Sequence, residues 1–98
     1  MQFARNVQFQ VKTGKEQELN SLLEKEVLPI LRKQTGFQEE VTLVNTKGAH
    51  LISLWDNRKN AEAYETATYP SVLAKLTPVI EGTPRVETYE TASSYARA

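Results

Sequence analysis

Residues 49–64 read AHLISLWDNRKNAEAY, and this stretch decides the fold. It opens with a seven-residue run that is apolar on both faces and ends in the only tryptophan, Trp55. A strand of this kind is covered on both sides, so it belongs in the middle of a sheet. Asp56 and Asn57 then offer side chains that cap a helix, and apolar residues follow at helical spacing. The stretch therefore predicts a central strand that leads directly into a helix.

The composition limits the class of protein. Ninety-eight residues make a single domain, 1–98, with a modest core. Twelve basic and twelve acidic residues are interspersed, which argues against a surface for nucleic acid or for a membrane. Cysteine is absent, which excludes disulfides, thiolate metal sites and thiol catalysis. No apolar run is long enough to span a bilayer, and residues 1–5 lack the apolar core of a signal peptide, so we expect a cytoplasmic protein.

The N-terminal half predicts two strands on either side of a long helix. Residues 3–11 alternate between apolar and polar side chains, which predicts a strand with Arg5 on its apolar face and an amide-rich face opposite. Residues 15–34 carry an apolar stripe at helical spacing, and Pro29 inside it predicts a kink or a break. Residues 37–45 alternate again. The turn after them has hairpin chemistry, so this strand pairs antiparallel with the central strand.

The C-terminal part predicts a broken helix and a last strand. Residues 57–67 are helical, and a second helical segment runs from Pro70 to about Ile80. A glycine and a proline then close the helical region. Residues 86–91 alternate in character and form the fourth strand.

The order of elements, βαββαβ, predicts an α+β protein with a ferredoxin-like fold. Its four-stranded antiparallel sheet carries helices on one face, and right-handed crossovers place the first and third strands in the centre. A chain this short covers only one face of the sheet. Ile52 and Leu54, or the face that carries Trp55, would be exposed in a monomer. We therefore expect a homodimer formed through the open face of the sheet.

Five residues are candidates for a functional site. Trp55, with Ser53 on its face, either packs between strand and helix or forms the wall of a pocket. Arg5 shares a face with apolar residues, where a charge is costly unless it pairs with a glutamate or binds an anionic group. Tyr64 and Tyr69 flank the helix break, and they either orient a phenol-like oxygen or fill the gap between helix and sheet. The break itself is either a lid or a change of helix direction.

Other signatures of chemistry are few. His50, the only histidine, is the one group that titrates near neutrality without help, and strand parity places it on the face opposite Trp55. A structural or dimer-lining role suits it better than that of a general base. The sequence has no phosphate-binding loop, no dinucleotide fingerprint, no zinc-protease motif and no nucleophile elbow. We expect neither a metal nor a cofactor.

Several motifs occur along the chain: Gly14-Lys15, Gly36-Phe37, Leu54-Trp55-Asp56, Ala61-Glu62-Ala63-Tyr64 and Val86-Glu87-Thr88-Tyr89-Glu90. Together these motifs resemble the antibiotic biosynthesis monooxygenase family, over almost the whole chain. The resemblance implies a dimeric alpha-beta barrel, in which the sheets of two subunits face each other and a pocket lies between the sheet and helices of each subunit. It also implies an oxidoreductase, a cofactor-independent monooxygenase that acts on a small aromatic, quinol-like or anthrone-like substrate.

On this interpretation Trp55 and Tyr64 are the candidate catalytic residues, and Arg5, Ser53 and Tyr69 are the candidate substrate-binding residues. The alternative is a non-catalytic dimeric module of the same fold that binds a small apolar or aromatic ligand. The haem-degrading branch of the family is a third possibility. Its asparagine, tryptophan and histidine fall on Val7, Tyr64 and Ala74, which argues against haem degradation.

Overall fold

The chain follows the predicted order of strands and helices. The computed structural model describes residues 2–93 and 95, so Met1 and residues 94 and 96–98 of the predicted domain lie outside the described residues. The helical regions include one π-helical and one 3₁₀ segment. The elements in order are β1 (Phe3–Val11), α1 (Glu16–Leu22), η1 (Leu23–Val27), α2 (Leu28–Arg32), β2 (Phe37–Asn45), β3 (Gly48–Trp55), α3 (Arg58–Ala67), α4 (Tyr69–Leu76), η2 (Thr77–Val79) and β4 (Ile80–Glu90).

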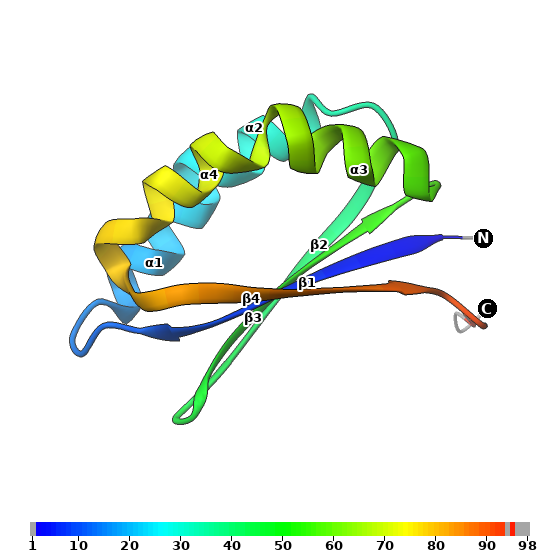
Figure 1. The fold of residues 1–98 in the computed structure, drawn as a ribbon. Helices are drawn as coiled ribbons and strands as arrows, with labels where there is room; N and C mark the ends of the chain where they lie inside the picture. The colour runs from blue at the N-terminus through cyan, green and yellow to red at the C-terminus, as the bar shows by residue number, and fades with distance from the viewer. Residues whose placement is uncertain (1, 94, 96–98) are drawn as a thin grey trace.

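One antiparallel sheet of four strands, in the order β2-β3-β1-β4, carries the helices on one face (Figure 1). The central positions of β1 and β3 confirm the prediction from right-handed crossovers. Their register places Phe3 opposite Trp55 and Arg5 opposite Ser53. The antiparallel pairing of β2 with β3 confirms the predicted hairpin. The α+β ferredoxin-like fold is therefore confirmed.

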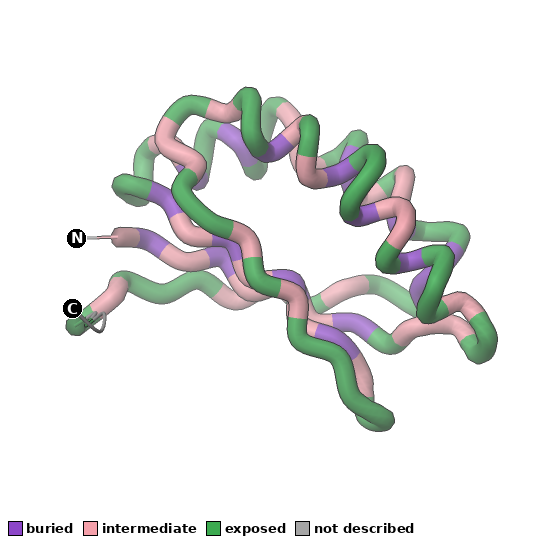
Figure 2. The backbone as a smooth tube through the Cα atoms, turned by 180° about the vertical axis from the view of Figure 1, so that it is seen from behind, coloured by how far each residue is buried: buried purple, intermediate pink, exposed green. Residues whose placement is uncertain are grey.

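The hydrophobic core lies between the sheet and the helices. Along β1 and β3, buried residues alternate with partly exposed ones (Figure 2). The buried set on β3 includes Leu51 and Trp55, whereas Ile52 and Leu54 on the other face are only half-buried. One face of the central strand is thus covered by the chain's own helices, and the other face is open. Among the described residues, no helix is both long enough and apolar enough to cross a bilayer.

The break predicted at Pro29 is a π-helical segment. Residues Leu23–Val27 form this segment, and the Leu28 N–H donates to the Leu23 carbonyl five residues earlier. Proline has no N–H, and its ring clashes with the carbonyl four residues before it. The helix accommodates this clash by widening for one turn just before Pro29.

The predicted start of the last strand is wrong. β4 begins at Ile80, which the apolar spacing places in the helix, and not at residue 86. Gly82, with φ of 69°, and Pro84 lie inside the strand, where its pairing with β1 shifts register. A bulge accommodates a glycine in the left-handed region, and an edge strand tolerates a proline. The two residues that resemble a turn therefore do not end the element.

Candidate active site

Arg5 lies at the centre of the candidate site. The alternation of β1 points its side chain toward the helices, where it is only 2% exposed. Its neighbours across the sheet are Ser53 on β3 and Thr88 on β4. Its Nη2 lies 3.3 Å from the Glu65 Oε1 on α3, which confirms that Arg5 pairs with a glutamate.

Two tyrosine rings also contact the guanidinium of Arg5. Its central carbon lies 4.5 Å from the ring centroid of Tyr69 and 5.2 Å from that of Tyr64. A cation over an aromatic face is stabilised by roughly 0.5–2 kcal/mol, with the larger values for desolvated groups. The two tyrosines therefore help to offset the cost of burying this charge.

Trp55 and Ser53 form the layer behind the tyrosines. The Trp55 ring is fully buried, with its centroid 4.9 Å from that of Tyr64 and 5.7 Å from that of Phe37. Its Nε1 donates a 2.9 Å hydrogen bond to the Ser53 Oγ, so the two side chains share one face as predicted. Trp55 packs between strand and helix in this structure. The five predicted site residues therefore lie in one continuous cluster.

Burial raises the pKa of both tyrosines. Desolvation raises the pKa of Tyr64 to about 12, although the nearby Arg5 charge acts in the opposite direction. Burial also raises the pKa of Tyr69, again against the effect of Arg5. An ordinary tyrosine is already neutral at physiological pH, and the raised pKa keeps these two phenols neutral further into the alkaline range. Both hydroxyl groups are thus available as hydrogen-bond donors.

A pocket of about 280 Å³ lies beside Arg5, between α3 and the β1–β4 half of the sheet. A second ion pair stands at this pocket, with Arg58 Nε 3.3 Å from Glu62 Oε1. Of the five predicted residues, Arg5 lines the pocket, and the other four are not among its lining residues. The lining residues are Phe3, Arg5, Arg58, Ala61, Glu62, Glu65, Val86 and Thr88.

Seven of the eight lining residues were not predicted as site residues, and they include the polar residues Glu65, Arg58 and Thr88. Glu65 is the glutamate that pairs with Arg5, and its position directly after Tyr64 is the only sequence signal for it. Arg58 begins α3, and its side chain is mostly exposed. Thr88 lies beside Arg5 only because of the register between β1 and β4, which a single sequence does not reveal.

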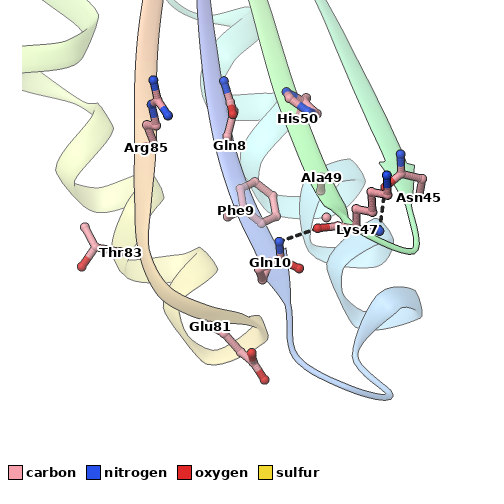
Figure 3. Close-up of a pocket in the computed structure, with 11 residues that line it drawn as sticks. Gln8, Phe9, Gln10, Asn45, Lys47, Ala49, His50, Glu81, Thr83 and Arg85 are labelled. Atoms are coloured by element: carbon pink, nitrogen blue, oxygen red, sulfur yellow. Dashed lines mark hydrogen bonds between the residues drawn. The ribbon is translucent and has the colours of Figure 1, made fainter.

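A second pocket, of about 400 Å³, lies over the end of the sheet near the β2–β3 hairpin. His50, Gln8 and Arg85 follow one another across three strands in this pocket (Figure 3). The His50 Nδ1 lies 3.2 Å from the Asn6 Oδ1, and the Gln8 Nε2 donates a 3.0 Å bond to Glu87. His50 therefore belongs to the face opposite Trp55, as predicted, away from Arg5. Within the described part of the chain, no group of three or more histidine, aspartate or glutamate side chains is arranged to hold a metal ion.

Several solved structures share the fold of this chain along nearly their whole length. SnoaB, a cofactor-independent oxygenase from Streptomyces nogalater, superposes with a TM-score of 0.78 at 12% identity, over 98% of each chain. A monooxygenase from the gene ActVA-Orf6 of Streptomyces coelicolor, in complex with nanaomycin D, has a TM-score of 0.76 at 18% identity, over 98% of this chain and 92% of that one. A Bordetella bronchiseptica protein provisionally assigned as an antibiotic biosynthesis monooxygenase has a TM-score of 0.78 at 11% identity, over 94% and 98%.

The chain has the fold of the antibiotic biosynthesis monooxygenases. The sequence identities to these three structures are low. The similarity therefore concerns the fold and does not by itself assign a chemical activity. No protein-family model matches the sequence, and no curated protein matches it.

Proposed function

We propose that the protein is a monooxygenase that oxidises a small aromatic, quinol-like or anthrone-like substrate with molecular oxygen and without a cofactor. The observation that carries the proposal is the buried cation in the pocket wall. Arg5 is 2% exposed, lines a pocket and is held by two tyrosines. A positive charge in such a site stabilises a substrate oxyanion far more than it would in water. The fold shared with a cofactor-independent oxygenase supports the same conclusion.

The substrate itself supplies the electrons in this reaction. An anthrone loses a proton from its CH₂ group and becomes an electron-rich enolate, which reduces molecular oxygen. The CH₂ carbon becomes a carbonyl group, so four electrons pass to O₂. One oxygen atom enters the product, and the other leaves as water with the two hydrogens of the CH₂ group. The protein must bind the enolate and keep it in place.

The proposed roles follow from the contacts. Arg5 binds the enolate oxygen and favours loss of the proton, since an adjacent cation stabilises the charged form. Tyr64 and Tyr69 hold the guanidinium in position through their rings. Trp55 and Ser53 in turn hold Tyr64 through ring packing and the indole hydrogen bond. In this proposal Trp55 and Tyr64 contribute to catalysis by positioning Arg5.

Oxygen uptake with a panel of anthrones and quinols tests the proposal. We expect uptake above the blank, with Arg5→Lys slower by about ten- to a hundredfold because the planar guanidinium is lost. Trp55→Phe is expected to be slower than wild type by a smaller factor. Arg85→Lys is the matched control, since Arg85 is exposed on the other face of the sheet, and it should retain full activity. No uptake above the blank with any substrate would overturn the proposal.

We also propose that the protein is a homodimer formed through the open face of the sheet. Leu43 is 51% exposed and Tyr89 is 49% exposed, and Ile52 and Leu54 between them are half-buried. Polar residues on the same face bond to one another, as Gln8 does with Glu87. A face that combines apolar side chains with internally satisfied polar groups is suited to burial against a second copy.

A second candidate function is a non-catalytic module that binds a small apolar or aromatic ligand. It is favoured by the position of His50, the only histidine, on the face away from the Arg5 pocket. Native mass spectrometry of freshly purified protein distinguishes the two functions. A bound ligand that is retained without turnover supports the module, whereas conversion of a bound aromatic under oxygen supports the enzyme.

A further inference from the structure

The guanidinium of Arg5 has one donor without a partner. Its Nε is buried and makes no hydrogen bond with any described residue. A buried donor left unpaired costs roughly 1–3 kcal/mol, and more for a charged group. Buried polar groups in folded proteins are nearly always hydrogen-bonded, so this donor calls for an acceptor, which a ligand can supply. The pocket beside Arg5 is the place where that ligand can bind.

The position of this donor specifies the chemistry of the ligand. In a planar guanidinium, Nε and Nη2 lie on the same edge, and a planar oxyanion binds this edge through two parallel hydrogen bonds. Glu65 occupies the edge only in part, through one oxygen atom 3.3 Å from Nη2. Its side chain is 47% exposed, so it has open solvent into which it can move. The edge is therefore half-filled by a carboxylate of the protein itself.

We infer that the Arg5 pocket selects aromatic acids, whose carboxylate binds Nε and Nη2 of Arg5 together and displaces Glu65 into solvent. The inference rests on the proposed function in placing the aromatic ligand in this pocket, and it adds a class of ligand. An aromatic acid bound in this way occupies Arg5 in place of the enolate oxygen proposed above, so the acid and the enolate compete for the same guanidinium. In the absence of a ligand, the Glu65 carboxylate binds Arg5 in place of the ligand's carboxylate. Phe3, Ala61 and Val86 supply the apolar part of the pocket lining, where the ring would pack, and the remaining lining residues are Arg58, Glu62 and Thr88.

Calorimetric titration with 2-naphthoate and with its neutral analogue 2-naphthamide tests the inference. Both probes present the same ring, and neither has a CH₂ group to oxidise. We expect the wild-type protein to bind 2-naphthoate about tenfold tighter than 2-naphthamide, since two charge-assisted bonds form only with the acid. Glu65→Gln is expected to tighten 2-naphthoate binding about three- to tenfold, because the competing charge is removed. The affinity for 2-naphthamide should stay unchanged in this variant.

Glu26→Gln is the matched control. Glu26 is 52% exposed and also pairs with a cation on another element, Lys75, but it does not line the Arg5 pocket. It should leave both affinities unchanged. Equal affinity for the two probes, no binding of 2-naphthoate, or Glu65→Gln without effect on 2-naphthoate would each overturn the inference.

The binding test of this inference and the oxygen-uptake test of the proposed function can fail independently. Selective binding of 2-naphthoate that Glu65→Gln strengthens supports the inference even if no anthrone is oxidised. Oxidation of neutral anthrones by a protein that does not distinguish the two probes would overturn the inference and leave the oxygenase intact.

Discussion

The hydrogen bond from the Trp55 Nε1 to the Ser53 Oγ lies wholly inside the core. Ser53→Ala leaves the indole donor without an acceptor, and we expect it to lower the free energy of unfolding by about 1–3 kcal/mol. Urea denaturation measures this change. In a Trp55→Phe background the donor is gone, so the same serine substitution should cost much less. Equal costs in the two backgrounds would show that this bond does not contribute.

Tyr64 makes the free energy of unfolding depend on pH in the alkaline range. Burial raises its pKa to about 12, above the ordinary value of 10.0 in an unfolded chain. The unfolded chain therefore loses this proton first, and the stabilisation is complete below about pH 10 and lost as the pH rises toward 12.

We expect Tyr64→Phe to lose less stability than wild type between about pH 9 and pH 11, measured by urea unfolding at each pH. Tyr95→Phe is the control, since Tyr95 is 93% exposed, and it should follow the wild-type curve. If Tyr64→Phe also follows the wild-type curve, then ionisation of the Tyr64 phenol does not contribute to the pH dependence of stability.

The connection between α2 and β2 depends on one glycine. Gly36 has φ of 83°, and its carbonyl accepts a 2.9 Å bond from the Asp56 N–H. A Cβ atom at this position would overlap the side-chain ends of Asp56 and Asn60 and would lie 2.8 Å from the Asn60 Cβ, which cannot rotate away. Gly36→Ala therefore adds a steric clash at the start of α3, which carries Tyr64 and Glu65.

Gly14 provides the comparison, because it has φ of 80° and nothing within 4 Å of an added Cβ. We expect Gly14→Ala to cost about 1–2 kcal/mol from the backbone conformation alone. Gly36→Ala should cost roughly 1–3 kcal/mol more, from the additional clash. Thermal and urea unfolding of the two variants measure the difference. Equal costs would show that the contact between this turn and α3 is not tight.

Elements with a strong local pattern could be predicted from the sequence. β1 and β2 have the predicted bounds, and the alternation of β1 placed Arg5 on the covered face. The start of β4 could not be predicted, because Gly82 and Pro84 indicate a turn unless the pairing partner β1 is known. Tertiary pairing overrides local preference at that point.

The candidate site, like the fold, could be predicted only where the local sequence pattern determines it. The sequence shows that Arg5 needs a counter-charge, but it contains many glutamates, and only the docking of α3 on β1 selects Glu65. The pocket and the unpartnered Nε of Arg5 likewise depend on how elements far apart in the chain pack together.

The whole molecule presents one covered and one open face of the sheet. Leu43 and Val44 are almost equally exposed, at 51% and 50%, but neighbouring residues in a strand point to opposite faces. Leu43 pairs with His50 on the open face, whereas Val44 pairs with the buried Ala49. We expect Leu43→Lys to dissociate the proposed dimer and Val44→Lys to leave it intact, as measured by sedimentation velocity at micromolar concentration. A wild-type monomer, or equal effects of the two variants, would contradict the dimer.

The position of the ligand site on the helix side of the sheet is the central claim of this account. NMR titration of the isotope-labelled protein with a soluble anthrone tests it most directly. We predict that the largest amide shifts fall on Arg5, Arg58, Glu65 and Thr88, which line the Arg5 pocket. Shifts centred on Gln8, His50 and Arg85, around the pocket on the opposite face, would contradict it, as would the absence of any shift.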